Sequence, residues 1–345
     1  MYFYEKCVTI KKNNPCGESS SPLFFGKKMK TVKIKAYAKL NLTLEITGAE
    51  NGYHMLDSLV ASVDLYDLVV VKPRKDKLSA VTMHGLGSES IPPEKNNALK
   101  AAEAFSEAFG TNGANITVYK NIPMGAGLGG SSADVSGVLN GMAQLYGVED
   151  RVALKRLADT LGSDTGYMLD GGFARMQGRG ERITLLDLPN KLHFLLLCPD
   201  SEVSSGRCYQ KYDELPKTLE WRESATEACI AALRKNDLES GGRYLTNDLY
   251  VPATHLNSDV ERAYEAAKAF SPLGAVMTGS GSCVAALFET RELCEWAKSR
   301  YRGKYRAIVV QTVSPEYTGK KKSGAWRNPY APTEEEKELL SGGQP

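Results

Sequence analysis

The stretch Pro123-Met-Gly-Ala-Gly-Leu-Gly-Gly-Ser-Ser132 is the most informative part of this 345-residue chain. Four glycines fall within its six residues 125–130, and apolar residues recur at helical spacing just behind it, in residues 135–146. A glycine-rich loop that leads into a helix can gather backbone N–H groups around an anion, and the helix adds its positive end. The stretch therefore predicts a phosphate-binding loop between a strand and a helix.

Other glycine-rich motifs fit this loop less well. A Walker A loop ends in Gly-Lys-Ser/Thr, and this loop contains no lysine. Gly125, Gly127 and Gly130 satisfy G-x-G-x-x-G, the dinucleotide-binding pattern. Pro123, however, interrupts the strand that this pattern needs, and the acidic residue expected about 20 residues on lies between two predicted helices. A flexible linker needs neither the proline nor the amphipathic helix.

Residues 32–46 carry apolar side chains at every even position. This period of two predicts an extended, half-buried chain with one polar face. Lys39 and Asn41 both occupy odd positions, so they project from the same side. A lone lysine on such a face is usually solvated, and a role for Lys39 depends on the other motifs.

The remaining pattern alternates strands and helices. We predict a turn at residues 50–52, with Tyr53 and His54 after it, and we expect Asn97 to cap the first helix and Ser258-x-x-Glu261 to form a capping box. From residue 193 on, the order β-α-β-β-α-β indicates a ferredoxin-like, split βαβ domain. Strands are expected at about 59–71, 115–120, 173–186, 193–198, 273–277, 283–288 and 305–313, and helices at about 97–109, 135–146, 151–161, 224–235, 258–270 and 290–301.

The two ends of the chain do not have the pattern of folded elements. Residues 1–28 lack the apolar core of a secretory signal, and we expect a leader that precedes a natural start at Met29. Residues 315–345 contain a lysine run and a glutamate run, which predicts a disordered charged tail. Between them we place two domains, 29–188 and 189–314.

Composition excludes several classes of protein. Lys+Arg (43) nearly equals Asp+Glu (41), and this net charge of +2 argues against a nucleic-acid-binding protein. The longest apolar runs, such as residues 194–198, are too short to span a membrane. The seven cysteines include no C-x-x-C pair, so we expect no disulfide framework, no metal site and a reducing cytoplasm.

Two further motifs place polar groups on tight turns. Asp164 follows Gly162, which ends a predicted helix, and a turn presents such a carboxylate rigidly. Gly279-Ser-Gly-Ser282 separates two predicted strands. Each motif alone is common in ordinary turns, and it is their combination with the phosphate loop that indicates a site.

Together, these motifs resemble the GHMP kinase superfamily. Within it, the sequences Ala38-Lys-Leu-Asn-Leu42 and Gly52-Tyr-His54 are most similar to members that phosphorylate 4-diphosphocytidyl-2-C-methyl-D-erythritol in non-mevalonate isoprenoid synthesis. The resemblance spans about residues 30–314 and rests also on Asp64-Leu-Tyr-Asp67, the loop 123–132, Leu161-Gly-Ser-Asp164, Gly171-Gly172, Gly178-Arg-Gly-Glu181, Asn247-Asp-Leu249 and Gly279-Ser-Gly-Ser282.

The resemblance implies an α+β fold with an N-terminal mixed α/β nucleotide-binding domain and a C-terminal ferredoxin-like domain. It implies an enzyme, a monomer or homodimer, that transfers the γ-phosphoryl of ATP to the 2-hydroxyl of that cytidine-diphospho sugar alcohol, with Mg²⁺ carried by the nucleotide. Lys39 and Asp164 become the catalytic pair, and Asn41, Tyr53, His54 and Tyr209 bind the substrate. The resemblance also implies that the ATP phosphates are bound by Pro123, Met124, Gly125, Ala126, Gly127, Leu128, Gly129, Gly130, Ser131, Ser132 and Ala133.

The sequence departs from the family pattern at two places. Ser131 replaces a glycine of the loop, and Thr165-Gly166 replaces Val-Pro after Asp164. Two alternatives therefore stay open: another GHMP enzyme, such as a mevalonate, homoserine or sugar kinase, or a nucleotide-binding regulator without catalysis. Tyr53 and His54 speak against the first alternative, and the pair Lys39 and Asp164 speaks against the second.

Overall fold

The computed structural model describes residues 31–88, 91–189, 191–216 and 223–314. The predicted leader at 1–28 and the predicted tail at 315–345 lie outside the described residues. None of the helices in the described ranges combines the length and apolar composition that a membrane crossing requires.

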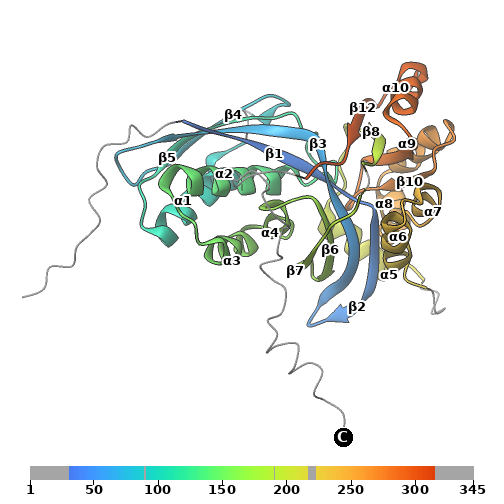
Figure 1. The fold of residues 1–345 in the computed structure, drawn as a ribbon, viewed down its shortest axis with the longest axis horizontal. Coiled ribbons are helices and arrows are strands. Elements are labelled where there is room, and N and C mark those ends of the chain that lie inside the picture. The colour runs from blue at the N-terminus through green and yellow to red at the C-terminus, as the bar shows by residue number, and fades with distance from the viewer. Residues whose placement is uncertain (1–30, 89–90, 190, 217–222, 315–345) are drawn as a thin grey trace, which may run out of the picture.

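An eight-stranded sheet forms the N-terminal part of the fold, built around the long strand β3 (Tyr53–Pro73). β3 pairs antiparallel with β1 (Val32–Asn41), β2 (Thr43–Glu50), β5 (Ala114–Tyr119) and β6 (Phe173–Gly178). β4 (Ala80–His84), β7 (Arg182–Leu186) and β9 (Thr246–Asn247) complete the sheet. The helices α1 (Asn97–Phe109), α2 (Gly130–Tyr146), α3 (Arg151–Leu161) and the single turn α4 (Thr165–Met168) lie together on one side of it (Figure 1).

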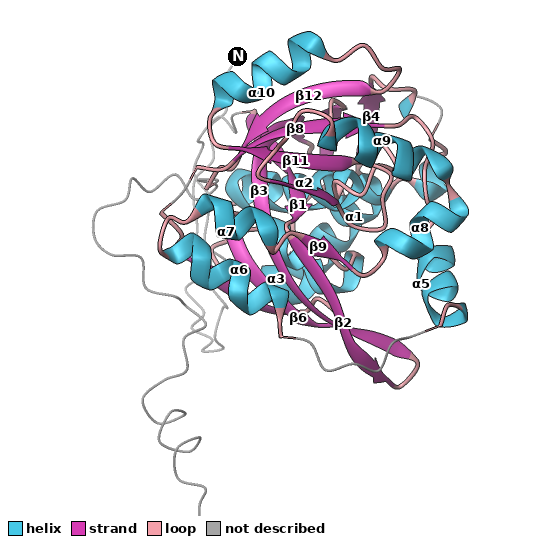
Figure 2. Cartoon of the chain, turned by 90° about the vertical axis from the view of Figure 1, so that its right-hand side faces the viewer, coloured by secondary structure: helices cyan, strands magenta, loops and turns pink. Residues whose placement is uncertain are grey.

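The C-terminal part contains a four-stranded antiparallel sheet with the order β10-β11-β8-β12. Its elements are β8 (His193–Cys198), α9 (Ser258–Lys268), β10 (Gly274–Met277), β11 (Val284–Phe288), α10 (Arg291–Arg300) and β12 (Arg306–Gln311). The spatial order with the first strand inside, between the third and the fourth, confirms the predicted ferredoxin-like arrangement. Figure 2 shows this sheet with α9 and α10 beside it.

Between β8 and α9 the chain makes an excursion that the sequence pattern only partly predicted. Its elements are α5 (Ser205–Glu214), α6 (Ala225–Arg234), α7 (Leu238–Arg243), β9 and α8 (Tyr250–Leu256), of which only α6 was expected. β9 returns to the N-terminal sheet and pairs parallel with β2. The excursion therefore brings C-terminal residues onto the strand that follows Lys39.

Two helix caps differ from the prediction by one residue. The side chain of Asn96, not of Asn97, accepts from the backbone N–H groups of the first turn of α1. Asn257, not Ser258, caps α9 in the same way. In both places an adjacent Asn has the extended backbone that a cap needs, so the predicted cap residue becomes the first residue of the helix.

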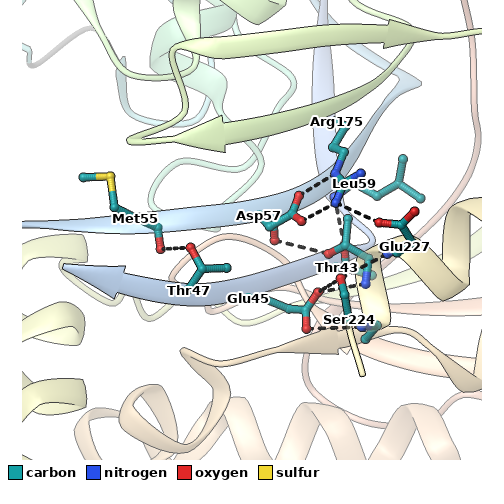
Figure 3. Close-up of polar contacts among 11 residues, drawn as sticks. Thr43, Glu45, Thr47, Met55, Asp57, Leu59, Arg175, Ser224 and Glu227 are labelled. Atoms are coloured by element: carbon teal, nitrogen blue, oxygen red, sulfur yellow. Dashed lines mark hydrogen bonds and ion pairs between the residues drawn. The ribbon is translucent and has the colours of Figure 1, made fainter. Parts of the chain in front are cut away.

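The pattern of residues 32–46 predicts a half-buried chain with one polar face, and the structure buries that polar face from Lys39 to Glu45. Thr43 and Glu45 are buried as fully as Leu44 between them. Figure 3 shows the reason: the first turn of α6 lies against β2, and Glu45 accepts hydrogen bonds from Ser224 Oγ and from the backbone N–H of Thr226, at 3.0 and 2.8 Å. Burial alone raises the pKa of Glu45, but these hydrogen bonds outweigh it and hold the pKa below its usual value.

A second polar contact closes this junction from the other strand. Asp57 on β3 forms a bidentate ion pair with Arg175 on β6, with N–O distances of 2.8 and 2.6 Å (Figure 3). Arg175 also forms an ion pair with Glu227 of α6. Such planar carboxylate–guanidinium pairs fix geometry as well as charge. The N-terminal sheet is therefore joined to α6 by the buried hydrogen bonds of Glu45 and, at the surface, by the ion pair of Arg175 with the exposed Glu227.

Alternate side chains of β8 enter two different hydrophobic cores. Phe194 and Leu196 pack with the residues of the N-terminal sheet and of α2, whereas Leu195 and Leu197 pack with α9 and α10. A strand that is buried on both faces is expected to be apolar without alternation. The unbroken apolar run of residues 194–198 in β8 agrees with this. The domain boundary near residue 188 stays a prediction.

Candidate active site

Lys39 is placed at a bulge in β1. The register between β1 and β3 shifts between Tyr37 and Lys39, and a bulge of this kind re-aims a side chain. The backbone N–H of Lys39 donates to the carbonyl oxygen of Leu128 at 3.0 Å, so the strand is tied to the glycine loop. The side chain is only 5% exposed, and its Nζ lies 3.4 Å from Oδ2 of Asp164. The two predicted catalytic residues are thus brought together.

Asp164 lies directly before the short turn α4. Tyr167 and Met168 of this turn are buried in the core, and Tyr167 Oη donates to the carbonyl oxygen of Gly172 at 2.7 Å. A Cβ at Gly166 would lie 2.0 Å from a carboxylate oxygen of Asp159, a partly exposed side chain that can move aside. The turn is therefore anchored by packing, while the Asp164 side chain stays 29% exposed.

The glycine loop has the geometry that its sequence predicted. Gly125, Gly127 and Gly129 all have positive φ, and α2 begins at Gly130. Left-handed residues alternating in this way point successive N–H groups to one side, and the start of α2 adds its own unpaired N–H groups. Ser131, at the family's glycine position, is already helical, and its Oγ accepts a hydrogen bond from Asn97 at 2.9 Å.

The Gly279-Ser-Gly-Ser282 loop packs directly against the glycine loop. The backbone N–H of Cys283 donates to the carbonyl oxygen of Ala126 at 3.2 Å, and a Cβ on Gly127 would lie 2.1 Å from the carbonyl oxygen of Thr278. Glycine at 127 is therefore required by contact with a second segment of the chain as well as by its φ of 76°.

Asn41 links these pieces. Its Oδ1 accepts from Lys39 Nζ and from the backbone N–H of Gly279, the latter at 3.1 Å. Its Nδ2 donates to Ser58 Oγ at 2.9 Å, and its backbone N–H donates to Thr278 Oγ1 at 3.0 Å. The structure thus gives Asn41, predicted to bind substrate, a set of contacts that orients Lys39.

Two cavities meet at this cluster. The first, of about 390 Å³, is lined by the glycine loop, by the start of α1 and by Lys120 and Asp134. The second, of about 910 Å³, is lined by Tyr53, His54 and Tyr209. The residues that line both are Asp164, Ser205 and Ser280. Asp164 therefore lies where a group bound in one cavity faces a group bound in the other.

The three aromatic residues of the second cavity are not equivalent. His54 stacks on Tyr209, with ring centroids 4.9 Å apart and an interplanar angle of 23°. Tyr53 is exposed, and the guanidinium of Arg179 covers its ring at 4.7 Å from the centroid. Burial and then the negative charge of Asp164 raise the pKa of Tyr209 to about 12, so its hydroxyl stays neutral.

Sequence reasoning missed a buried ion cluster beneath the glycine loop. Lys120 forms ion pairs with Asp67 and with Asp134, the latter at 2.6 Å, and all three side chains are almost fully buried. Asp67 also accepts from the backbone N–H of Ile122 at 2.8 Å. Asp67 lies in one of the motifs of the family resemblance, but the sequence does not pair it with Lys120 and Asp134, because only the fold brings the three segments together.

This arrangement can support phosphoryl transfer. A loop of convergent N–H groups can hold phosphates, and a carboxylate beside a lysine can accept a hydroxyl proton while positive charge stabilises the transferred group. In the described ranges, no group of three or more His, Cys, Asp or Glu residues is arranged to hold a metal ion. Mg²⁺ usually binds through one or two carboxylates plus substrate phosphates, so the donors present fit an ion that enters with a nucleotide.

Comparison with known proteins agrees with this geometry. Residues 96–174 match the family model of the GHMP kinases N terminal domain, and residues 229–305 match that of the GHMP kinases C terminal domain. Fold and site thus define a small-molecule kinase of the GHMP type. The solved structure of a homoserine kinase from Cytophaga hutchinsonii has the same fold, with a TM-score of 0.65, 20% identity and coverage of 85% of this chain and 97% of that one.

More similar relatives narrow the assignment. The 4-diphosphocytidyl-2-C-methyl-D-erythritol kinase of Symbiobacterium thermophilum is 35% identical over 291 residues, which cover 82% of this chain and 100% of the relative. That of Caldicellulosiruptor saccharolyticus is 32% identical over 284 residues, covering 81% and 96%. A crystal structure of a 4-(cytidine 5'-diphospho)-2C-methyl-D-erythritol kinase has a TM-score of 0.66 and 31% identity, covering 81% and 98%. The chain belongs to the 4-diphosphocytidyl-2-C-methyl-D-erythritol kinase family.

Proposed function

We propose that this protein transfers the γ-phosphoryl group of ATP to the 2-hydroxyl of 4-diphosphocytidyl-2-C-methyl-D-erythritol. One observation carries the proposal: Asp164, 3.4 Å from Lys39, lies at the meeting point of the two cavities. ATP occupies the cavity of the glycine loop, and the cytidine-diphospho substrate occupies the other, so the two reacting groups meet beside Asp164.

The roles of the residues follow from this placement. Asp164 accepts the proton of the attacking hydroxyl, and Lys39, which pairs with that carboxylate, stabilises negative charge on the transferred group. Residues 123–133 hold the phosphates through backbone N–H groups and the start of α2. Bound Mg²⁺ supplies charge neutralisation for the nucleotide phosphates.

The second cavity suits the other end of the substrate. Tyr53, His54 and Tyr209 offer ring faces and polar edges for the cytosine base. Among the described residues that line this cavity, Arg179 is the only Lys or Arg, while Asp159, Asp164, Glu181 and Asp213 are acidic. A diphosphate needs a cation in such surroundings, and we assign this part to Arg179.

We also place the enzyme in the cytoplasm, acting on small molecules as a monomer or homodimer. The five cysteines in the described part of the chain, which are Cys198, Cys208, Cys229, Cys283 and Cys294, are free thiols. This supports a reducing compartment.

A coupled ADP-release assay with a panel of acceptors tests the proposal. We expect turnover with 4-diphosphocytidyl-2-C-methyl-D-erythritol and none above background with methylerythritol phosphate, mevalonate, homoserine or galactose. Turnover of mevalonate or homoserine at a similar kcat/KM would favour another GHMP kinase. Nucleotide binding without turnover of any acceptor would favour the regulator.

A further inference from the structure

Helix α5 places three side chains against His54, and two of them have no role in the function proposed above. Tyr209, Tyr212 and Asp213 are three and four residues apart, so they share one helix face. Tyr209 stacks on the His54 ring, and Tyr212 meets it edge-on at 5.8 Å and 86°. Oδ1 of Asp213 lies 2.9 Å from Nε2 of His54. One helix thus fixes both the plane and the polar edge of this ring.

The position of α5 is itself fixed at the active site. At its first residue, Ser205 Oγ lies 2.8 Å from Ser280 Oγ, so this end of the helix is tied to the Gly-Ser-Gly loop. Cys208 is fully buried, and its Sγ donates to the carbonyl oxygen of Leu249 at 3.6 Å. The contact with His54 therefore comes from an anchored helix, although Asp213 is 54% exposed and His54 18%.

The chemistry of this contact determines where the proton of His54 resides. An ionised carboxylate only accepts hydrogen bonds, so Nε2 of His54 carries the hydrogen that it donates to Asp213. In the neutral imidazole the other nitrogen, Nδ1, is then left with a lone pair and accepts. Without Asp213, no partner of this kind selects between the two neutral tautomers.

We propose that Asp213 is a positioning residue that holds His54 with Nε2 protonated and Nδ1 as an acceptor, and so makes the site prefer cytosine over uracil. The inference rests on the proposed function, in which His54 faces the base. Cytosine presents an amino donor at position 4, whereas uracil presents a carbonyl oxygen there. Nδ1 of His54 accepts a hydrogen bond from the amino group of cytosine and repels the carbonyl oxygen of uracil.

The first arm of the test reads the tautomer directly and needs no substrate. The ¹⁵N spectrum of the imidazole nitrogens, assigned by the loss of signal in His54→Gln, is recorded at pH 8 for the wild type, Asp213→Ala, Asp213→Asn and Glu214→Ala. Glu214 is the neighbouring exposed carboxylate and pairs with Lys211, so Glu214→Ala is the matched control. We expect Nε2–H in the wild type and the control, a mixture of tautomers in Asp213→Ala, and Nε2–H kept in Asp213→Asn, whose amide oxygen still accepts.

The second arm measures the affinities for CDP and UDP by calorimetry on the same proteins. We expect the wild type to prefer CDP by about tenfold or more, Asp213→Ala to lose about tenfold of that preference, and Asp213→Asn and Glu214→Ala to keep most of it. A preference that is unchanged in Asp213→Ala overturns the proposal, as does a wild-type His54 protonated on Nδ1. A wild type that binds CDP and UDP equally refutes the reading of cytosine in the proposed function, and the spectra still report whether Asp213 sets the tautomer.

Discussion

Replacing Asp164 by Asn tests the catalytic assignment with little change of shape. The amide occupies the volume of the carboxylate but cannot take the hydroxyl proton. Loss of a positioned general base typically lowers turnover by about 10²–10⁴-fold, which corresponds to a barrier increase of roughly 3–5 kcal/mol. Lys39 loses its ionic partner at 3.4 Å but keeps Asn41, so its side chain stays in place.

The structure also predicts that Asp164→Asn leaves the stability of the fold and the affinity for ATP nearly unchanged. The Asp164 side chain makes no capping hydrogen bond to α4 and is 29% exposed, so we expect a change of no more than about 1 kcal/mol in the free energy of unfolding. The dissociation constant for ATP should change little, because we propose that the glycine loop and the start of α2, and not Asp164, bind the phosphates. Asp170→Asn is a matched control, since Asp170 is similarly exposed and pairs with Arg151 away from both cavities.

The measurements are kcat from ADP release, ATP affinity by calorimetry and the melting temperature, all on the same preparations. The expected pattern is a large loss of kcat in Asp164→Asn alone, with both variants folded and binding ATP. Near-normal kcat in Asp164→Asn would refute the assignment of the base. An equal loss in Asp170→Asn would show that the effect comes from the general stability of this region.

Three further changes test the loop, the buried ion cluster and the substrate cavity. Gly127→Ala should lower the melting temperature and weaken ATP binding more than Gly147→Ala, because both have positive φ but only a Cβ at 127 meets backbone, at 2.1 Å; equal effects would contradict this. Burial, opposed by the neighbouring lysine and increased by a second aspartate, raises the pKa of Asp134 to about 7. The folded protein therefore binds one more proton than the unfolded chain between about pH 4 and 7, and the free energy of unfolding falls as pH rises through this window. In urea unfolding, Asp134→Asn should show a weaker dependence of this free energy on pH than the wild type. The same pH dependence in both proteins would contradict the raised pKa of Asp134. Arg179→Gln should raise KM for the cytidine-diphospho substrate about tenfold and leave kcat nearly unchanged. Arg182→Gln, at an exposed position, is the control and should leave KM unchanged. An unchanged KM in Arg179→Gln would refute the assignment of Arg179 to the substrate diphosphate.

Much of the fold was predictable because its strands and longer helices carry regular periods. The alternation in residues 32–46, the turn at 50–52 and the helical stripe behind the glycine loop all correspond to observed elements. The short helices α5, α7 and α8 were missed, since six to ten residues give too few repeats for a helical period to stand out. Their positions are set by tertiary packing, of α5 against α8, of α8 against α9 and of α7 against α6 and β10, rather than by local sequence.

The site was predictable to the extent that its residues lie in motifs. Lys39, Asp164 and the glycine loop are brought together as the motifs indicated. The cluster of Lys120 with two aspartates was not predictable, although Asp67 lies in a family motif, because its members come from separate segments and no spacing relates them. Asp213 belongs to the same class: it becomes informative only when α5 is seen to lie beside His54.

The polar side chains from Lys39 to Glu45 are buried. This burial connects the site residues that the sequence predicted with the contacts that it did not predict. A lysine on a solvated strand face would move freely and would be a poor electrostatic catalyst, because preorganisation requires fixed partners. Here α6 and β9 of the C-terminal excursion lie against β2, and the loop after β10 covers the side of Lys39, where Asn41 joins Lys39 to the backbone of Gly279. The same loop packs the carbonyl of Thr278 against Gly127. The active site is therefore built at the seam of the two parts of the chain, and the departure from the simple alternating pattern, buried polar residues where solvated ones were expected, marks the functional face of the strand.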